Sequence, residues 1–270
     1  MRNHILAFLM MLGMGAPVLA CGADTDCAIG DRSYRIAMPE GHDGAGKVPV
    51  LAFAHGYKGS AKGVMRNKSL RRLASDLGAA LIAFNSIDGT WSIPNHPGHM
   101  EADGSVEFSY VRAVLEDAAS QFPLDTSRVV STGFSSGGML TWNLACEMPD
   151  RFAGFVPVAG TFWLVPPETC NKPVTSIVHI HGDADRTVPL TGRVIGPTKQ
   201  GEVAEALAMY QEFGGFAPKA KAQAYGPLTC DSATNNDGDV MMFCLFKGGH
   251  SFRTEYVRFG WEQLMAAGRL

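Results

Sequence analysis

The chain has 270 residues, of which 46% are hydrophobic and 18% are charged. This is the composition of an ordinary globular protein, and one α/β domain of this length can bury a full core. The formal net charge of −3 argues against a nucleic-acid partner and against attraction to an anionic membrane. The sequence contains no basic run, heptad pattern or repeat, so we expect one domain.

Residues 1–20 have the features of a secretory signal peptide. A short basic start precedes an apolar stretch over residues 5–14, too short to span a bilayer, and small residues lead to a cleavage point after Ala20. We therefore expect a secreted or periplasmic protein whose folded domain covers residues 21–270. A lipoprotein is the alternative, because Cys21 follows directly and a lipid on its sulfur would anchor the domain to a membrane.

From residue 33 onward, strand-like and helix-like segments alternate. The predicted strands are an edge strand at 33–38, then 48–54, 79–84, a strand from 128 onward that follows a turn at 125–127, 154–160, 174–181, 220–225 and 240–246. The predicted helices are 64–78, 106–121, 139–146, 200–213 and 254–267. This alternation predicts an α/β fold with a mostly parallel central sheet and helices on both faces. Only about thirteen residues separate the strands ending at 160 and starting at 174, which leaves no room for a large cap domain.

The sequence GFSSG at residues 133–137 is a G-x-S-x-G motif. Such a motif forms a nucleophile elbow when a strand precedes it and a helix follows. The β-branched pair Val129 and Val130 predicts the strand, and the apolar segment 139–146, which Pro149 stops, predicts the helix. Glycines two positions to either side of Ser135 would let neighbouring backbone pass close to the turn. We therefore predict that Ser135 is the nucleophile of a serine hydrolase.

A serine nucleophile needs a base, and the base needs an orienting acid. Asp183 and Asp185 follow a predicted buried strand, and His250 follows the last one, after two glycines. The chain order serine, acid, histidine is that of the α/β-hydrolase triad. His250 is the predicted base, while these residues alone leave the acid open between Asp183 and Asp185.

The tetrahedral intermediate requires two preorganised N–H donors. We expect one from the backbone of Ser136, directly after the nucleophile, and the other from Tyr57 in the glycine-rich loop that follows residues 48–54. Trp91 and Trp163 are candidates to line an acyl or aryl pocket, with a place in the core as the alternative.

Other polar residues fit structural roles better. His55 is expected to shape the turn at Gly56, and His179 and His181, two apart on one strand face, to be packed or hydrogen-bonded. The segment NNDGD at 235–239 lacks the acidic spacing of a calcium loop and is typical of a turn. We predict no metal ion and no cofactor.

An even number of cysteines favours an oxidising compartment. Six cysteines allow fifteen pairings, and our single prediction is Cys230 with Cys244, since they flank the turn at 235–238. A bond between Cys21 and Cys27 would compete with lipidation. Cys146 is expected to be a small buried thiol on the helix after the elbow.

Five segments together resemble the secreted polyhydroxybutyrate depolymerase and feruloyl-esterase-like group of α/β-hydrolases. They are AHGY at 54–57, STGFSSGGM at 131–139, LACEMPDRFA at 144–153, HIHGDADRTVP at 179–189 and GGHSF at 248–252. The resemblance covers roughly residues 33–259 and implies the α/β-hydrolase fold. It places the catalytic acid on Asp185, through the family's H-G-x-x-D-x-x-V-P pattern. Phe252 stands where the family has tryptophan, which leaves the acyl pocket undefined.

The resemblance implies a secreted serine esterase that acts through an acyl-enzyme on polyhydroxybutyrate oligomers or feruloyl and other aryl esters. Nothing resembling a polymer-binding module follows residue 259 in this sequence, which favours oligomers or soluble esters over crystalline polymer. Two alternatives stay open: a peptidase-like hydrolase on the same fold, and a non-catalytic binding protein of that fold. The intact set Ser135, Asp185 and His250 argues against the second.

Overall fold

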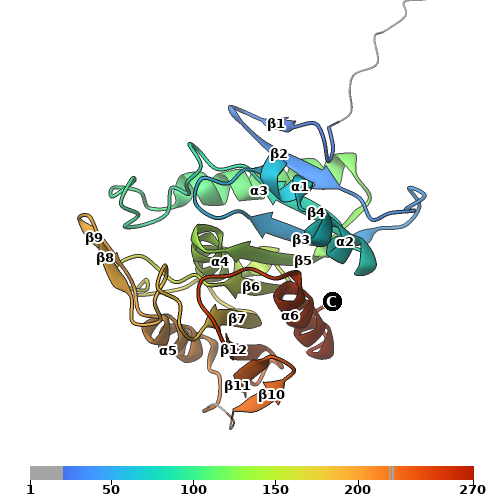
Figure 1. Ribbon diagram of the computed structural model, residues 1–270. Coiled ribbons are helices and arrows are strands. Elements are labelled where there is room, and N and C mark those ends of the chain that lie inside the picture. The colour runs from blue at the N-terminus through green and yellow to red at the C-terminus, as the bar shows by residue number, and fades with distance from the viewer. Residues whose placement is uncertain (1–20, 219, 221) are drawn as a thin grey trace, which may run out of the picture.

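The structure is a computed structural model that describes residues 21–218, 220 and 222–270 (Figure 1). The predicted signal peptide at 1–20 lies outside the described residues. The strands are β1 Cys27–Ile29, β2 Arg32–Ala37, β3 Val48–Ala54, β4 Ala80–Phe84, β5 Leu124–Phe134, β6 Gly154–Val158, β7 Ile177–Gly182, β8 Arg193–Ile195, β9 Thr198–Gln200, β10 Gln223–Tyr225, β11 Leu228–Thr234 and β12 Val240–Phe246. The helices are α1 Ala61–Arg66, α2 Lys68–Asp76, α3 Ser105–Gln121, α4 Ser136–Glu147, the 3₁₀ turn η1 Pro149–Arg151, α5 Val203–Gly214 and α6 Thr254–Ala266.

One ten-stranded sheet runs in the order β1-β2-β4-β3-β5-β6-β7-β12-β11-β10. The strands from β4 to β12 in this order are parallel, and antiparallel pairs flank them at both ends. Because the central strands are covered on both faces, they are almost wholly apolar, as in the VPVLAFA sequence of β3. The mostly parallel sheet predicted from the alternating segments is therefore confirmed.

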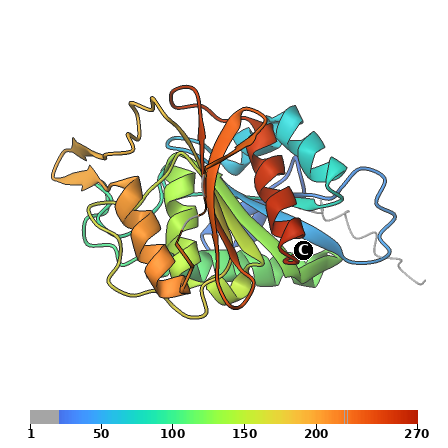
Figure 2. The same ribbon diagram turned by 90° about the horizontal axis from the view of Figure 1, so that it is seen from below.

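Helices cover both faces of the sheet, which Figure 2 shows nearly edge-on. The core on one face includes buried side chains of α3, α4 and α5, and the core on the other face includes those of α1, α2 and α6. Helix α4 is buried along its length except at Glu147, as a central helix against the sheet must be.

Three of the predicted elements are corrected. The helix expected over 64–78 is two helices, α1 and α2, because Asn67 has an extended backbone and its side chain accepts from the Leu70 N–H to start α2. The strand predicted to lie at the edge is β2, but β1 pairs with it on its outer side and is the edge strand of the sheet. The turn expected at 125–127 is part of β5, where the register against β3 shifts.

The antiparallel partner of β12 is β11, and the segment near 220–225 contributes only β10 beyond it. The polar sequence LTCDSAT hides β11 from hydrophobic periodicity. In this pairing Cys230 lies opposite Cys244, and the two form the predicted disulfide.

Two further disulfides link Cys21 with Cys27 and Cys146 with Cys170. The expectation of a free thiol at Cys146 is wrong, because the end of α4 lies next to the loop after β6 and the two sulfurs meet there. The Cys21–Cys27 bond occupies the sulfur that a lipid would need, so the structure favours the disulfide over lipidation.

The loops after β3, β4, β5, β6, β7 and β12 all lie at the carboxyl ends of the parallel strands, which we call the catalytic edge. In Figure 1 the 85–104 segment and the β8–β9 hairpin extend from this same side. Open α/β sheets bind their ligands at this edge.

Candidate active site

Ser135 lies between the end of β5 and the start of α4, in a backbone conformation that residues with side chains rarely adopt. Its φ is 59° and its ψ is −120°. Such a conformation costs on the order of 1–3 kcal/mol and persists only where the surroundings enforce it. Here the Ser135 N–H donates to the Val158 carbonyl at 2.9 Å, which ties the turn to β6. The sequence motif is therefore a strained strand-to-helix turn.

The glycines of the motif are required by close backbone contacts. A Cβ on Gly133 would lie 2.3 Å from the Gly137 carbonyl oxygen, and a Cβ on Gly137 would lie 2.0 Å from the Ala54 carbonyl oxygen. No side chain fits at either position without moving β3 or α4, which is the steric reason expected from the sequence.

His250 and Asp185 meet although 65 residues separate them. The Nδ1 of His250 donates to Oδ2 of Asp185 at 2.7 Å, while Oδ1 of Asp185 accepts the N–H groups of Thr187 at 2.7 Å and Val188 at 2.9 Å. Burial by itself would raise the pKa of Asp185, but hydrogen bonds from His181, His250 and Val188 outweigh it and hold that pKa far below its usual range. The carboxylate is thus ionised and fixed against His250.

The His250 ring lies beside the elbow. Its centroid is 4.6 Å from that of Phe134, the residue before the nucleophile. The hydrogen bonds among the described residues join His250 to Asp185 and do not include one to Ser135. Hydrogen bonds of this kind are often long in a free enzyme and shorten when substrate binds.

Asp183 has a different role from Asp185. Its carboxylate accepts from Lys247 Nζ at 2.6 Å and from the Gly248 N–H at 3.1 Å, and the bond from Lys247 lowers its pKa. These contacts hold the loop that carries His250, so Asp183 supports the base indirectly.

The loop after β3 passes directly beside the nucleophile. A Cβ on Gly56 would lie 3.6 Å from Cβ of Ser135. The Lys58 and Gly59 N–H groups are used within the loops, whereas the Tyr57 N–H has no acceptor among the described residues. Ser136 begins α4, so its N–H has no partner within the helix and the positive end of the helix dipole adds to it. The Tyr57 and Ser136 N–H groups are therefore both available to an oxyanion.

Trp91 does not line a substrate pocket, contrary to expectation. The side chain is fully buried, and its indole N–H donates to the His55 carbonyl at 3.0 Å. His55 itself donates from Nδ1 to the Gly56 carbonyl at 2.8 Å and accepts the Ser86 N–H at Nε2, and burial lowers its pKa. Both side chains brace the loop that presents Tyr57.

Trp163 is also mostly buried, at 6% exposure, but it faces a cavity. This cavity of about 220 Å³ lies between the 85–104 segment, α4 and the loop after β6. The Trp163 ring meets His96 edge-on at 5.3 Å, and its indole N–H has no acceptor among the described residues. A role for Trp163 in substrate binding stays a prediction.

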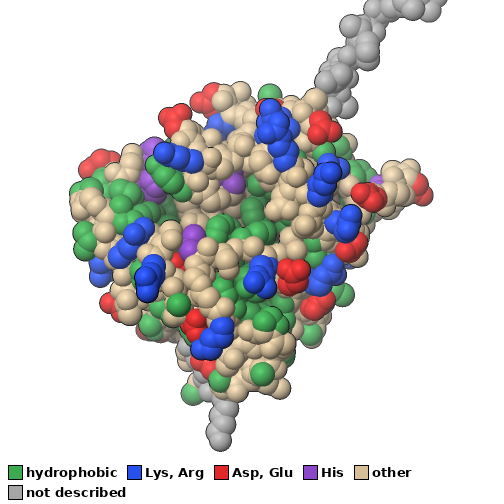
Figure 3. All heavy atoms as spheres, in the orientation of Figure 1, with side chains coloured by type: hydrophobic (Ala, Val, Ile, Leu, Met, Phe, Trp, Pro, Cys, Tyr) green, Lys and Arg blue, Asp and Glu red, His purple; other side chains and the backbone are tan. Residues whose placement is uncertain are grey.

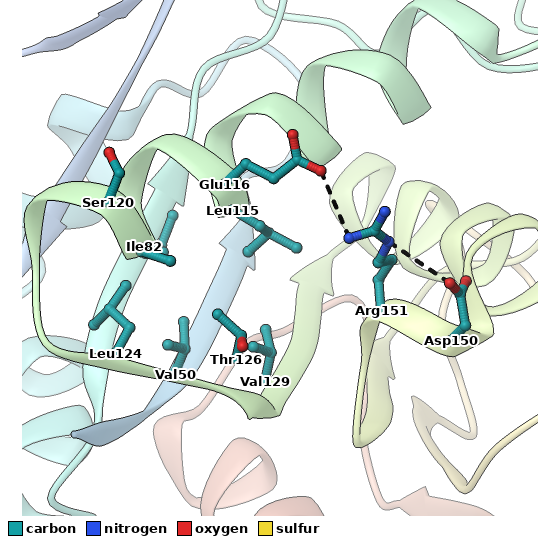
Figure 4. Close-up of a pocket in the computed structure, with 11 residues that line it drawn as sticks. Val50, Ile82, Leu115, Glu116, Ser120, Leu124, Thr126, Val129, Asp150 and Arg151 are labelled. Carbon is teal, nitrogen blue, oxygen red and sulfur yellow. Dashed lines mark ion pairs between the residues drawn. The ribbon is translucent and has the colours of Figure 1, made fainter.

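A larger cavity of about 480 Å³ lies far from this chemistry, at the amino ends of β3 and β5 (Figure 4). Its floor is apolar, and Glu116, Arg151 and Asp150 form ion pairs on its rim. Its walls contain no serine–histidine pair. The described residues contain no cluster of histidine, cysteine or carboxylate side chains suited to a metal ion.

Sequence reasoning missed the backbone donors at Thr187 and Val188, because an N–H group leaves no signature in a residue type. It also missed the contact between Phe134 and His250. The family pattern H-G-x-x-D-x-x-V-P ends in Val-Pro, however, and its valine is Val188 in this sequence.

A family model described as Phospholipase/Carboxylesterase matches residues 88–196, which include Ser135 and Asp185. NocK of Nocardia uniformis subsp. tsuyamanensis is 32% identical over 173 residues, covering 62% of this chain and 48% of NocK. The chain therefore spans about half the length of that relative. Feruloyl esterase C of Emericella nidulans is 23% identical over 209 residues, covering 72% of this chain and 73% of that protein.

Solved structures resemble the whole domain. The acetyl xylan esterase from Aspergillus awamori matches 89% of this chain and 95% of its own chain, with a TM-score of 0.60 and 17% identity. Identity at this level shows a common fold and does not identify a substrate.

Proposed function

We propose that the chain is a serine esterase of the carboxylesterase branch of the α/β-hydrolases and that it acts through an acyl-enzyme, in keeping with its similarity to that family over residues 88–196 and to feruloyl esterase C. The observation that carries the proposal is the strained turn at Ser135 with the His250–Asp185 hydrogen bond beside it. A structural role alone gives no reason to place a serine in a costly conformation next to a histidine that is held by a carboxylate.

In the proposed first step, Ser135 Oγ attacks the ester carbonyl carbon and His250 Nε2 takes the hydroxyl proton. The carbonyl oxygen becomes an anion and accepts from the Tyr57 and Ser136 N–H groups. Collapse of this intermediate breaks the bond to the alcohol, which leaves with the proton from His250. Water then repeats the sequence on the acyl-enzyme, releasing the acid and regenerating Ser135. Asp185 stabilises the imidazolium in both halves.

We propose an apolar or aromatic ester as the substrate, of the hydroxybutyrate-oligomer or feruloyl type. Exposed hydrophobic side chains support this choice, since five of the seven large ones in the described chain lie on the loops that follow the parallel strands or on the β8–β9 hairpin. They are Tyr57, Met100, Leu164, Val165 and Val194. In Figure 3 histidine and hydrophobic side chains reach the surface close together on the side of the β8–β9 hairpin. The similarity to feruloyl esterase C points the same way.

We also propose that the protein acts outside the cytoplasm. All cysteines of the described chain are paired in disulfides, which persist in oxidising compartments. The signal-peptide-like sequence at 1–20 supports export. Over the described residues, no helix has the length and apolar character needed to cross a membrane.

The test is to label purified protein with a fluorophosphonate probe and to assay p-nitrophenyl, feruloyl and hydroxybutyrate-oligomer esters beside the matching amides. We expect labelling and ester hydrolysis in the intact protein and neither in Ser135→Ala. Labelling that persists in Ser135→Ala would refute the assignment of the nucleophile, and amide turnover exceeding ester turnover would favour a peptidase. Failure to hydrolyse any ester would overturn the esterase proposal.

A further inference from the structure

A chain of buried side chains leads from helix α4 to the catalytic acid. The indole N–H of Trp142 donates to Nδ1 of His179 at 3.1 Å, and Nε2 of His179 lies 3.0 Å from Nδ1 of His181. Nε2 of His181 lies 2.8 Å from the Val188 carbonyl oxygen and 3.5 Å from Oδ2 of Asp185. Trp142, His179 and His181 are all fully buried. The proposed reaction uses none of these three side chains directly.

The hydrogen-bond partners at the two ends fix the position of every proton in this chain. An indole N–H can only donate, so His179 accepts at Nδ1 and, when neutral, carries its proton on Nε2. His179 therefore donates to Nδ1 of His181, which places the proton of His181 on Nε2. A carbonyl oxygen can only accept, so Val188 at the far end requires the same arrangement.

Both histidines must be neutral for this arrangement to hold. A proton on Nδ1 of His181 would face the N–H of His179, and a proton on Nδ1 of His179 would face that of Trp142. The surroundings agree, since Phe243 stacks on His179 at 5.7 Å and burial depresses the pKa of His179.

His181 contacts both sides of the turn that holds the acid. Its N–H reaches the Val188 carbonyl, while the Val188 N–H donates to Oδ1 of Asp185. The ring N–H of His181 also approaches Oδ2 of Asp185, the oxygen that accepts the hydrogen bond from His250. Among the described residues, the side chains that contact this carboxylate are two histidines, and neither lysine nor arginine is present.

We propose that His181 is a positioning residue for the catalytic acid, held in one tautomer by His179 and Trp142. This inference rests on the proposed function. His181 fixes the 185–188 turn and directs Oδ2 of Asp185 at His250. As a neutral donor it steadies the carboxylate while leaving its negative charge for the imidazolium that forms during the reaction, whereas a cation there would compete for that charge.

The positions of these protons can be tested in the intact protein without an activity assay. Nitrogen-15 NMR of the histidine side chains between pH 5 and 8 distinguishes the two neutral tautomers and the cation. We expect both rings to carry their protons on Nε2, with Nδ1 unprotonated. A proton on Nδ1 of either ring would overturn the proposal.

The consequence for catalysis is tested with two substitutions at one position. His181→Leu removes the donor and the acceptor, so we expect kcat to fall about 10- to 100-fold as the acid loses its fixed orientation. KM should be unchanged because the fully buried His181 cannot touch substrate. His181→Gln keeps one donor and one acceptor, and should recover most of the kcat. The downfield proton resonance of the His250–Asp185 hydrogen bond should weaken in the leucine variant and return in the glutamine variant.

Ser176→Ala is the matched control for lost stability. Ser176 is fully buried just before β7, where its hydroxyl donates to Asp239 and accepts the Val240 N–H, far from the elbow. We expect this variant to lower the melting temperature while leaving kcat unchanged. If His181→Leu keeps the kcat of the intact enzyme, or if His181→Gln is no better, the positioning role is refuted while the esterase proposal stands. If the intact enzyme hydrolyses no ester, the proposed function itself fails, and the NMR result still decides the tautomers.

Discussion

The two edges of the sheet differ in how their backbone is built. In the described part of the chain, six residues other than glycine have a positive φ, and all lie on loops at the catalytic edge. They are Lys58, Asp88, Asn95, Ser135, Ala159 and Leu164. At the opposite, amino edge, this conformation is adopted by glycines such as Gly41 and Gly78, where a Cβ would meet open space. The catalytic edge therefore retains side chains in strained conformations, and the amino edge avoids the strain.

Cavity size does not mark the candidate site. The amino edge has the cavity of about 480 Å³, and the cavity of about 220 Å³ beside Trp163 is lined by the carboxyl half of α4 and not by Ser135, Asp185 or His250. The proposed chemistry lies at the edge where strain, a fixed carboxylate and free N–H donors occur together. A large hollow without such groups is poor support for an active site.

The largest expected difference between the edges is in catalysis. Asp185→Asn should lower kcat about 10⁴-fold, because an amide cannot fix the required tautomer of His250 or stabilise its cation. Asp183→Asn should cost far less, because its carboxylate contacts Lys247 and Gly248. Glu116→Gln, at the rim of the amino-edge cavity, should leave kcat unchanged. Steady-state kinetics on one p-nitrophenyl ester would measure all three, and equal losses in the two aspartate variants would contradict the assignment of the acid.

The next largest effect should be on folding. Gly137→Ala forces a Cβ to within 2.0 Å of the Ala54 carbonyl oxygen and should cost about 3 kcal/mol or more. Gly63→Ala is the control. Gly63 lies inside α1, where an added Cβ would have only Ser60 Oγ nearby, at 3.5 Å, so this variant should be more stable by about 0.5–1 kcal/mol. Urea unfolding would compare them, and a mild effect of Gly137→Ala would mean that β3 and α4 can separate at little cost.

A smaller effect tests the strain directly. Ser135→Gly should be more stable than Ser135→Ala by about 1 kcal/mol, because glycine tolerates the φ of 59°. The same preference for glycine holds at the amino edge, where Gly78→Ala should lose about 1–2 kcal/mol. Equal stability of the two Ser135 variants would show that the elbow stores no strain.

The smallest effect is expected from a surface ion pair at the amino edge. Asp125 accepts from Ser127 and from Arg128 Nε at 2.7 Å, and these bonds lower its pKa to about 2. Asp125→Asn should cost less than about 1 kcal/mol at pH 7 and leave kcat unchanged. Because the folded-state pKa is the lower one, the contribution is present above the unfolded pKa of about 4 and is lost as the pH falls toward 2. Unfolding midpoints of both proteins should therefore converge at low pH, and a gap that persists there would exclude this ion pair as the cause.

Much of the fold could be predicted because its elements have strong local signals. The apolar runs of β3 and β12 indicate the bounds of both strands correctly. The polar strand β11 has no such run, because its place in the sheet depends on pairing with β12 and not on its own apolar residues. The break at Asn67 depends on one side-chain cap within an otherwise helical pattern.

The candidate site divides in the same way. Glycine spacing is a local steric requirement, so the sequence alone indicates the elbow at Ser135. The order of Ser135, Asp185 and His250 along the chain limits the possible partners, although the choice of Asp185 over Asp183 needs the family resemblance. The misplacement of Trp91 has an equally physical cause, because residue type does not reveal whether an indole faces a pocket or braces a loop.

The sequence by itself determined the nucleophile turn and the α/β class, since each depends on neighbouring residues or on periodicity. It also led to Cys230 with Cys244 as one pairing out of fifteen and, through the family resemblance, to Asp185 as the acid. Only the tertiary structure decided how Asp185 meets His250, which N–H groups are free, and how Trp142, His179 and His181 are linked behind the acid. Those contacts join residues from different strands and helices. Their distances depend on how the sheet and its helices pack, and no short stretch of sequence contains that information.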